Sequence, residues 1–272
     1  GTLRIGVSDS LLVGVLAPVL SELSRTYPRV CASTHQQMPD EQFAMLRRND
    51  IDVLLLLDER MERPEWVKVF EVPAEVGFVA AATDPLARRT KVPLEEVLSR
   101  PLFLTERDVS YRTGLDERIW ARGLEATPRV ECGNTAFLAE LVEGCGGVSF
   151  LPSCAVRAAV TAGRLAHVDV DFERLDLWHQ AIVRKNKVVT PQMRLFLELV
   201  QRELAGFVAL VGAGLEITEV GGHAVRQSQH AGLLVQHRQA LIGRHVVLVH
   251  DELRDAGVDI ACAGAHGNAG QR

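Results

Sequence analysis

Hydrophobic positions in this chain alternate between short continuous runs and longer stretches of helical spacing. Residues 53–57 are five apolar residues in succession, a pattern typical of a strand that is buried on both faces. Between residues 12 and 23 apolar side chains recur every three or four positions, as they do on one face of a helix. Strands and helices that alternate over residues 3–57 predict a wound α/β unit in which helices cover a parallel sheet.

The same rhythm returns after residue 100 and predicts a second unit of the same kind. The first unit is expected to contain strands at residues 3–7, 30–36 and 51–57, a helix that ends near residue 26 and a helix at 39–48. The second is expected to contain strands at 101–104, 128–132, 148–151 and 165–170, and helices at 113–122, 135–143 and 152–161. The remaining expected elements are strands at 66–72, 76–82 and 175–184, a short helix at 93–100 and a helix at 190–204.

Two wound units imply an α/β fold with two Rossmann-like subdomains joined by two crossing strands, at residues 76–82 and 175–184. One subdomain is expected to comprise residues 1–74 and 181–205, and the other residues 75–180. In such sheets ligands bind beyond the carboxyl ends of the strands, close to helix N-termini. The cleft between the two subdomains is therefore the expected binding site.

Short polar side chains follow the predicted strands at this edge of each sheet. The candidate ligand-binding residues are Ser8, Ser10, Thr34, Gln36, Thr105, Asn134 and Thr135. Free N–H groups at neighbouring helix N-termini favour an anion. Four of these residues stand where helices begin, so helix capping and ligand binding both remain open for them. Arg107 and Arg112 are the nearest basic residues, and both are expected on the solvated surface.

Charge and cysteine usage narrow the function classes. The 272 residues carry a formal net charge of −5, whereas a domain that neutralises DNA phosphates alone normally presents a basic face. The five cysteines show no C-x-x-C spacing, which argues against a disulfide framework or zinc knuckle and for a reducing compartment. Neither a signal peptide nor a membrane-spanning run is predicted.

Motifs that would indicate catalysis are incomplete. Residues 147–151 begin like a nucleophile elbow but lack its closing glycine, and no P-loop lysine follows the glycines of residues 144–147. The histidines at positions 35, 167 and 179 are far apart in the sequence, which disfavours a metal site. We therefore expect a binding protein rather than an enzyme, with no catalytic residue, metal or cofactor.

A set of landmarks in fixed order carries a family resemblance. They are residues 1–6, Tyr27-Pro28, Ile51-Asp52-Val53, Asp84-Pro85-Leu86, the glycine-rich turn that leads into Leu151-Pro152, and Thr190-Pro191. This succession resembles the effector-binding domains of LysR-type transcriptional regulators, over about residues 1–205. The family usually has a His where Asp84 stands, and its strand corresponding to residues 53–57 is commonly less apolar. Both departures leave the class of ligand open.

The resemblance implies a type 2 periplasmic-binding-protein-like fold and a cytoplasmic sensor. Such a domain binds a small polar or anionic metabolite in the cleft between its subdomains, and it self-associates as a dimer or tetramer. DNA would be contacted only through an N-terminal winged helix-turn-helix that this sequence lacks. The alternative is a type 2 solute-binding protein of a transporter, which has the same fold; a signal peptide upstream would favour it.

Residues 206–272 differ from the rest in composition. They contain no Pro, Lys, Trp or Tyr but six of the nine histidines, three of which (His223, His230 and His237) are spaced seven apart. The apolar positions of a coiled coil are absent. We expect an extension outside the family fold, in which Gly212, Gly214, Gly221 and Gly222 form a linker and residues 241–251 a marginal strand.

Overall fold

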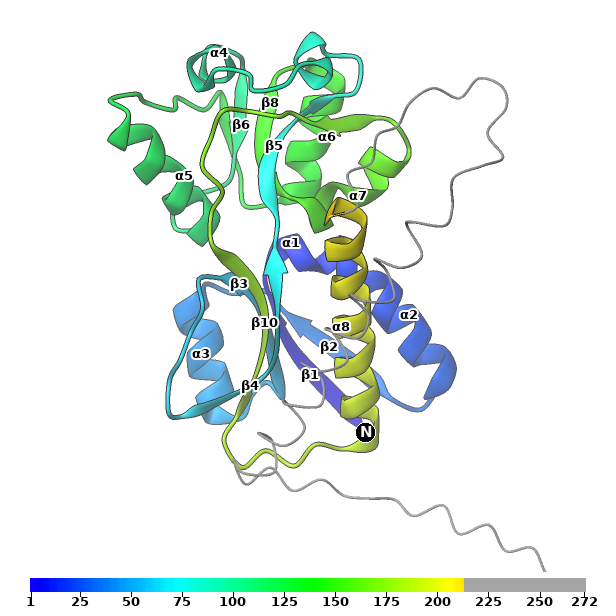
Figure 1. Ribbon diagram of the computed structural model, residues 1–272. Helices are drawn as coiled ribbons and strands as arrows, with labels where there is room; N and C mark the ends of the chain where they lie inside the picture. Colours follow the sequence, from blue (N-terminus) through cyan, green and yellow to red (C-terminus); the bar gives the residue numbers. More distant parts are fainter. Residues whose placement is uncertain (213–272) are drawn as a thin grey trace, which may run out of the picture.

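A computed structural model of the chain describes residues 1–212, which form two α/β lobes (Figure 1). The predictions for residues 213–272, including the histidine series and the strand at 241–251, lie outside the described residues. Gly212, expected in a linker, is instead the last residue of the final helix. Within the described part, no helix is both long enough and apolar enough to cross a membrane.

The first lobe is built on a five-stranded mixed sheet. Its strands, in spatial order, are β2 (Cys31–His35), β1 (Thr2–Val7), β3 (Val53–Asp58), β10 (Leu177–Arg184) and β4 (Trp66–Ala74). Strand β1 lies parallel to β2 and β3, whereas β10 runs antiparallel to both β3 and β4. The expected parallel sheet is therefore correct for the first three strands only, because an apolar run indicates burial and not direction.

Helices cover both faces of this sheet. On one face α2 (Ala17–Thr26) and α8 (Pro191–Gly212) pack against β1, and on the other α3 (Pro39–Arg48) packs against β3. Alternate side chains of β3 enter the two cores, since Val53 and Leu55 join the first and Leu54 and Leu56 the second. The prediction that residues 53–57 are buried on both faces is confirmed.

The second lobe repeats the plan with a different set of strands. Its sheet order is β7 (Val130–Glu131), β6 (Leu102–Leu104), β8 (Val148–Pro152), β5 (Val76–Ala81) and β9 (Leu165–His167). Strand β6 is parallel to β7 and β8, and β5 is antiparallel to β8 and β9. The helices are α4 (Leu94–Leu98) and α5 (Ser110–Ala121) on one face, and α6 (Thr135–Cys145) and α7 (Ser153–Thr161) on the other.

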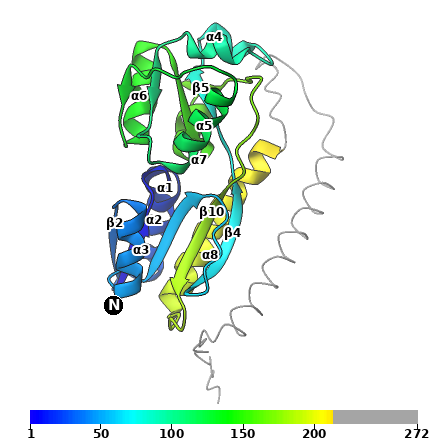
Figure 2. The ribbon, with the colours of Figure 1, turned by 90° about the vertical axis from the view of Figure 1, so that its left-hand side faces the viewer.

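The chain passes between the lobes twice. It crosses first at Glu75, between β4 and β5, and returns along residues 168–176, between β9 and β10 (Figure 2). Strands β5 and β10 were predicted as the crossing segments, but each belongs to one sheet and the crossing lies at its end. The strand that follows each crossing, β5 after the first and β10 after the second, runs antiparallel to its neighbours, so each sheet is mixed.

The segment after β1 contains an irregularity that the sequence did not indicate. Residues expected to form one helix consist of α1 (Asp9–Leu11), a π-helical turn (Leu12–Leu16) and α2. Within the π turn, Gly14 lies so close to the carbonyl oxygen of Cys154 in α7 that a Cβ there would be 1.9 Å from it. The turn is thus shaped by a close contact between the two lobes.

An ion-pair cluster joins the amino end of β3 to β1 and to the segment before α8. Asp52 accepts hydrogen bonds from the side chains of Arg4 (2.8 Å) and Lys187 (2.6 Å). Burial raises the pKa of the Asp52 carboxyl, but the hydrogen bonds from Arg4 and Lys187 outweigh it and lower that pKa to about 2. The cluster stabilises this end of the first lobe as long as Asp52 is ionised.

Candidate functional site

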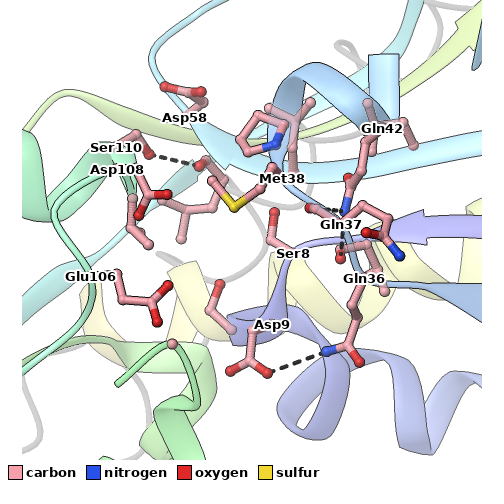
Figure 3. A pocket seen from close by; sticks show the side chains of 18 of the residues that line it. Ser8, Asp9, Gln36, Gln37, Met38, Gln42, Asp58, Glu106, Asp108 and Ser110 are labelled. Atoms are coloured by element: carbon pink, nitrogen blue, oxygen red, sulfur yellow. Dashed lines mark hydrogen bonds between the residues drawn. The ribbon is translucent and has the colours of Figure 1, made fainter. Parts of the chain in front are cut away.

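A cleft of about 520 Å³ lies between the lobes, at the carboxyl ends of the parallel strands (Figure 3). The first lobe contributes residues that follow β1, β2 and β3, and the second contributes the loop from β6 to α5 and Gly133. The volume falls within the range of small-molecule sites, about 300–1,000 Å³. This is the position that wound α/β topology predicts for a ligand.

Ser8 and Ser10 form the part of the first wall that follows β1. Ser8 continues the extended backbone of the strand and donates its N–H to the carbonyl of Leu55, at 3.1 Å. It stands at the N-cap position of α1, but its side chain makes no capping hydrogen bond. Ser10 is only 4% exposed, lines the cleft, and has no partner for its hydroxyl among the described residues. Both hydroxyls are therefore available to a ligand.

The loop from β2 to α3 completes this wall and is held by Gln42. The Gln42 side-chain amide donates to the carbonyls of Val7 (3.1 Å) and Gln37 (3.0 Å), which ties the loop to the end of β1. Gln36 donates to a carboxylate oxygen of Asp9, at 3.2 Å. The floor of the cleft is apolar, with Val7, Met38, Phe43, Leu54, Leu56 and Leu57 from the first lobe.

The opposite wall is the loop from β6 to α5, which carries Glu106 and Asp108. Figure 3 shows their side chains across the cleft from Ser8. The Glu106 carboxylate lies close to Gly133: a Cβ added to this glycine would be 3.3 Å from a carboxylate oxygen of Glu106. The Ser110 hydroxyl donates to the carbonyl of Leu57 in the first lobe, at 3.0 Å. The wall is thus anchored to the other lobe at the start of α5.

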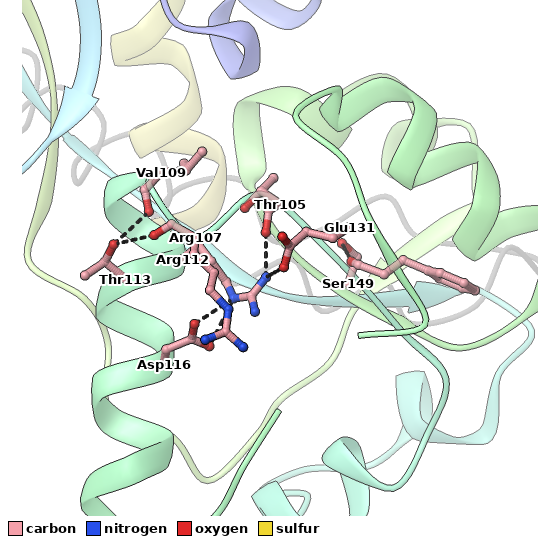
Figure 4. Close-up of polar contacts among 9 residues, drawn as sticks. Thr105, Arg107, Val109, Arg112, Thr113, Asp116, Glu131 and Ser149 are labelled. Carbon is pink, nitrogen blue, oxygen red and sulfur yellow. Dashed lines mark hydrogen bonds and ion pairs between the residues drawn. The ribbon is translucent and has the colours of Figure 1, made fainter. Parts of the chain in front are cut away.

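Behind this wall lies Arg112, which fixes the loop in place (Figure 4). It is only 1% exposed, contrary to the expectation of solvated surface. Its Nη1 donates to the carbonyl of Thr105 (2.5 Å) and to Glu131 (3.2 Å), and its Nε donates to both oxygens of Asp116. Two carboxylates pair with its charge, although its buried Nη2 has no hydrogen-bond partner among the described residues. Arg112 therefore positions the loop and does not itself line the cleft.

A direct bridge joins the lobes at one end of the cleft. One carboxylate oxygen of Asp9 accepts hydrogen bonds from the N–H (2.9 Å) and the hydroxyl (3.0 Å) of Thr135, the first residue of α6. A carboxylate at a helix N-terminus is favoured both by the free N–H groups and by the helix dipole. Asp9 therefore occupies the place where an external anion would bind to α6.

The predicted site residues fall into two groups. Ser8, Ser10 and Gln36 line the cleft. The residues that do not line it are Thr34, Thr105, Asn134 and Thr135. Thr34 is exposed on the edge strand β2, and Thr105 is 1% exposed behind the wall. Asn134 caps α6, with its side chain accepting from the N–H of Phe137 at 2.8 Å, and Thr135 is engaged by Asp9.

Carboxylates are the lining residues that the sequence analysis missed. Asp9, Asp58, Glu106 and Asp108 all line the cleft, and no Arg, Lys or His is found among its described lining residues. The signal was present, because Asp58 ends β3, Asp9 follows β1, and Glu106 and Asp108 follow β6, all at the same edge as the selected residues. They were passed over because helix N-termini suggested an anionic ligand. The lining gives that anionic alternative no support.

Burial alters the ionisation of two groups at the cleft. Desolvation raises the pKa of the Asp58 carboxyl, although the N–H of Glu59 and the hydroxyl of Ser110 partly offset it. Desolvation also raises the pKa of the Tyr111 phenol, so this side chain stays neutral. Among the described residues, no group of three or more His, Cys, Asp or Glu side chains could hold a metal ion.

Comparisons with known proteins agree with this architecture. The family model of the LysR substrate binding domain matches residues 1–205. The uncharacterized HTH-type transcriptional regulator YwqM of Bacillus subtilis is 25% identical over 204 residues, 74% of this chain. The chain spans between 52% and 69% of the length of the three curated relatives it matches, all HTH-type transcriptional regulators.

Solved structures show the same fold. The CcmR regulatory domain of Synechocystis PCC6803 in complex with 2-PG aligns with a TM-score of 0.60 at 16% identity, over 74% of this chain and 96% of that one. The effector-binding domain of QuiR in complex with shikimate aligns with a TM-score of 0.57 at 13% identity, over 76% of this chain and 98% of that one. The likeness at these identities concerns the fold alone.

Proposed function

We propose, because this chain belongs to the family of LysR substrate-binding domains, that it senses a small polar metabolite in the cleft between its lobes. The observation that carries the proposal is the cleft itself, about 520 Å³ in volume and lined by both lobes. Its Ser8 and Ser10 hydroxyls lack partners among the described residues, as a polar ligand requires. The whole protein would then regulate transcription, like the HTH-type relatives, through a DNA-binding part outside residues 1–212, and not act as an enzyme.

A sensor of this kind needs two conformers with different affinities for the ligand. The Asp9–Thr135 bridge and the hydrogen bond from Ser110 to Leu57 both join the two lobes. We call the arrangement in which both contacts are made the closed form. A ligand that touches both walls would change the stability of this form relative to one in which the contacts are broken. Ser8, Ser10 and Gln36 are the residues we expect to contact it. Thr105, Asn134 and Thr135 would shape the wall instead, and Thr34 would have no direct role.

We keep the predicted division of the chain as part of this proposal. Residues 1–74 and 181–205 would form one subdomain and residues 75–180 the other, except that residues 177–180 of β10 pair within the sheet of the first lobe. Residues 206–272 would form an extension. Helix α8 continues to Gly212, so the extension would begin inside a helix. Self-association into a dimer or tetramer is proposed from the resemblance to the family.

The test is a metabolite screen by thermal shift with the 272-residue chain. Ser8→Phe should fill the cleft, because this side chain faces the open space without a hydrogen bond, and should abolish the shift caused by any effector. Ser24→Phe is the matched control, since Ser24 is an exposed position of α2 that does not line the cleft. A compound at 100 times its Kd stabilises by about 2.7 kcal/mol. Compounds that shift the wild type and the Ser8→Phe variant equally would contradict the proposal.

A further inference from the structure

The charges that line the cleft have one sign. Two carboxylates, Asp9 and Asp58, come from the first lobe, and two, Glu106 and Asp108, come from the second. Among the described residues, Glu106 and Asp108 have no ion-pair partner. The buried cation Arg112 lies outside the cleft lining and is paired with Asp116 and Glu131. A ligand in this cleft therefore meets uncompensated negative charge on both sides.

Three helix N-termini lie near the cleft. Those of α3 and α5 have acidic residues close by in the sequence, Asp40 and Glu41 in the first turn of α3 and Asp108 just before α5, and that of α6 is already occupied. The N-terminus of α6 faces the cleft end, but its first N–H and hydroxyl are bound by Asp9. An external carboxylate or phosphate would have to displace Asp9 and then approach the remaining acidic side chains. Both steps oppose binding of an anion, because like charges repel, although the exposure of Glu106 and Asp108 to solvent reduces the size of this effect.

A second and independent observation indicates an organic ligand. Ser10 is nearly buried, lines the cleft, and leaves its hydroxyl without a partner among the described residues. The floor beside it is apolar, with Leu54, Leu56 and Phe43. A bare metal ion fits neither feature, and no three metal-binding side chains of the described residues converge.

We propose that the effector is a small organic cation, with an ammonium or guanidinium group between the walls and an apolar part on the floor. The cation would lie against Glu106 and Asp108 on one side and Asp58 on the other, while Ser10 accepts or donates a hydrogen bond. This assignment rests on the proposed function of the cleft. It also supplies a reason for closure, because a cation relieves repulsion between carboxylates of the two lobes and so binds the closed conformer better.

The experiment compares probes that share a carbon skeleton and differ in charge. The series are 1,4-diaminobutane, succinate and 1,4-butanediol, and phenethylamine, phenylacetate and 2-phenylethanol. Each is titrated into the 15N-labelled 272-residue chain, and Kd is measured from amide shifts around the cleft. We expect at least one amine to bind and both matched carboxylates to bind at least tenfold more weakly.

Variants separate the charge effect from a loss of folding. Glu106→Gln with Asp108→Asn keeps the size of both side chains and should weaken amine binding by roughly fivefold to tenfold, as expected for exposed charges. Glu117→Gln with Asp169→Asn is the matched control at exposed positions away from the cleft, and should leave Kd unchanged.

The outcomes distinguish this inference from the function on which it rests. Amines that bind, weaken in the double cleft variant and fail to bind Ser8→Phe would support both. Carboxylates that bind as tightly as the amines, and are lost in Ser8→Phe, would overturn the cationic assignment and leave the sensing function intact. Amines that bind nowhere, or bind equally to the double cleft variant, would also overturn the assignment.

Discussion

Removal of the Asp9–Thr135 bridge, which joins the two lobes, should lower the free energy of unfolding by a measurable amount. The Asp9 carboxylate accepts two hydrogen bonds from Thr135, at 2.9 and 3.0 Å, and Thr135 is only 4% exposed. A hydrogen bond to a charged group contributes about 1.5–3 kcal/mol when buried, and the carboxylate adds about 0.3–1 kcal/mol through the helix dipole. Because Asp9 is only partly buried, we expect Asp9→Ala to lower the free energy of unfolding by about 2 kcal/mol, in the lower part of this range.

A double-mutant cycle isolates the side-chain part of this bridge. Thr135→Val removes only the hydroxyl and retains the N–H bond, so it should destabilise by about 1 kcal/mol. In the Asp9→Ala background the same change should have much less effect, which gives a coupling energy near 1 kcal/mol. The four proteins are compared by urea denaturation, followed by tryptophan fluorescence.

Thr26→Val provides the matched control for the cycle. The Thr26 hydroxyl donates to a carbonyl of its own helix α2 and has no contact with Asp9, so its effect should add to that of Asp9→Ala within about 0.5 kcal/mol. A coupling energy below about 0.3 kcal/mol between Asp9 and Thr135 would refute the reasoning. So would a gain in stability for Asp9→Ala, since repulsion among the cleft carboxylates would then exceed the bridge.

Three further predictions concern pH and packing. Asp52→Asn should lower the free energy of unfolding by about 1–2 kcal/mol at pH 7. The folded-state pKa of Asp52 lies near 2, below its usual 3.8, so the difference from wild type should vanish as the pH falls from 4 to 2, which acid titrations of unfolding would measure. Burial lowers the pKa of His179 from 6.5 to about 3. As the pH falls below 6.5, the wild type should therefore lose stability relative to His179→Leu, by up to about 1.4 kcal/mol per pH unit. Acid-unfolding curves that run parallel for the two proteins would contradict this. Gly14→Ala should destabilise the fold by about 1–3 kcal/mol, because the new Cβ would lie 1.9 Å from the carbonyl oxygen of Cys154. Gly144→Ala in α6 is the control: a Cβ there would meet no atom within 4 Å, so this change should be neutral or stabilising in thermal melts.

Local signals predicted the elements well where their causes are local. Helix α3 begins at Pro39 and ends at Arg48, as expected from its proline, its charged ends and the closing Asn49, which adopts a left-handed φ of 60°. These preferences act within one turn of chain and need no tertiary contact. The directions of β5 and β10 were not predictable in the same way. Strand direction is set by which neighbour the chain meets after it crosses between the lobes.

The cleft was predictable in place but not in character. Topology places it at the strand ends, and Ser8, Ser10 and Gln36 do line it. A polar residue before a helix can bind a ligand, cap its own helix or bridge to another element, and these uses look alike in sequence. Asn134 is a cap and Thr135 a bridge, because Asp9 of the other lobe reaches α6, which is a contact across 126 positions of chain.

The bridge and the charge of the ligand are physically linked. An anion that bound the N-terminus of α6 would have to displace Asp9, and it would thereby open the contact that joins the lobes at that end. A cation near Glu106 and Asp108 leaves that contact intact and reduces the repulsion that Asp9 would otherwise meet across the cleft. If the cleft binds a cation as proposed, closure and cation binding would favour each other, while closure and anion binding would oppose each other. By linkage, a bridge that stabilises the closed form must also raise affinity for whichever ligand prefers that form.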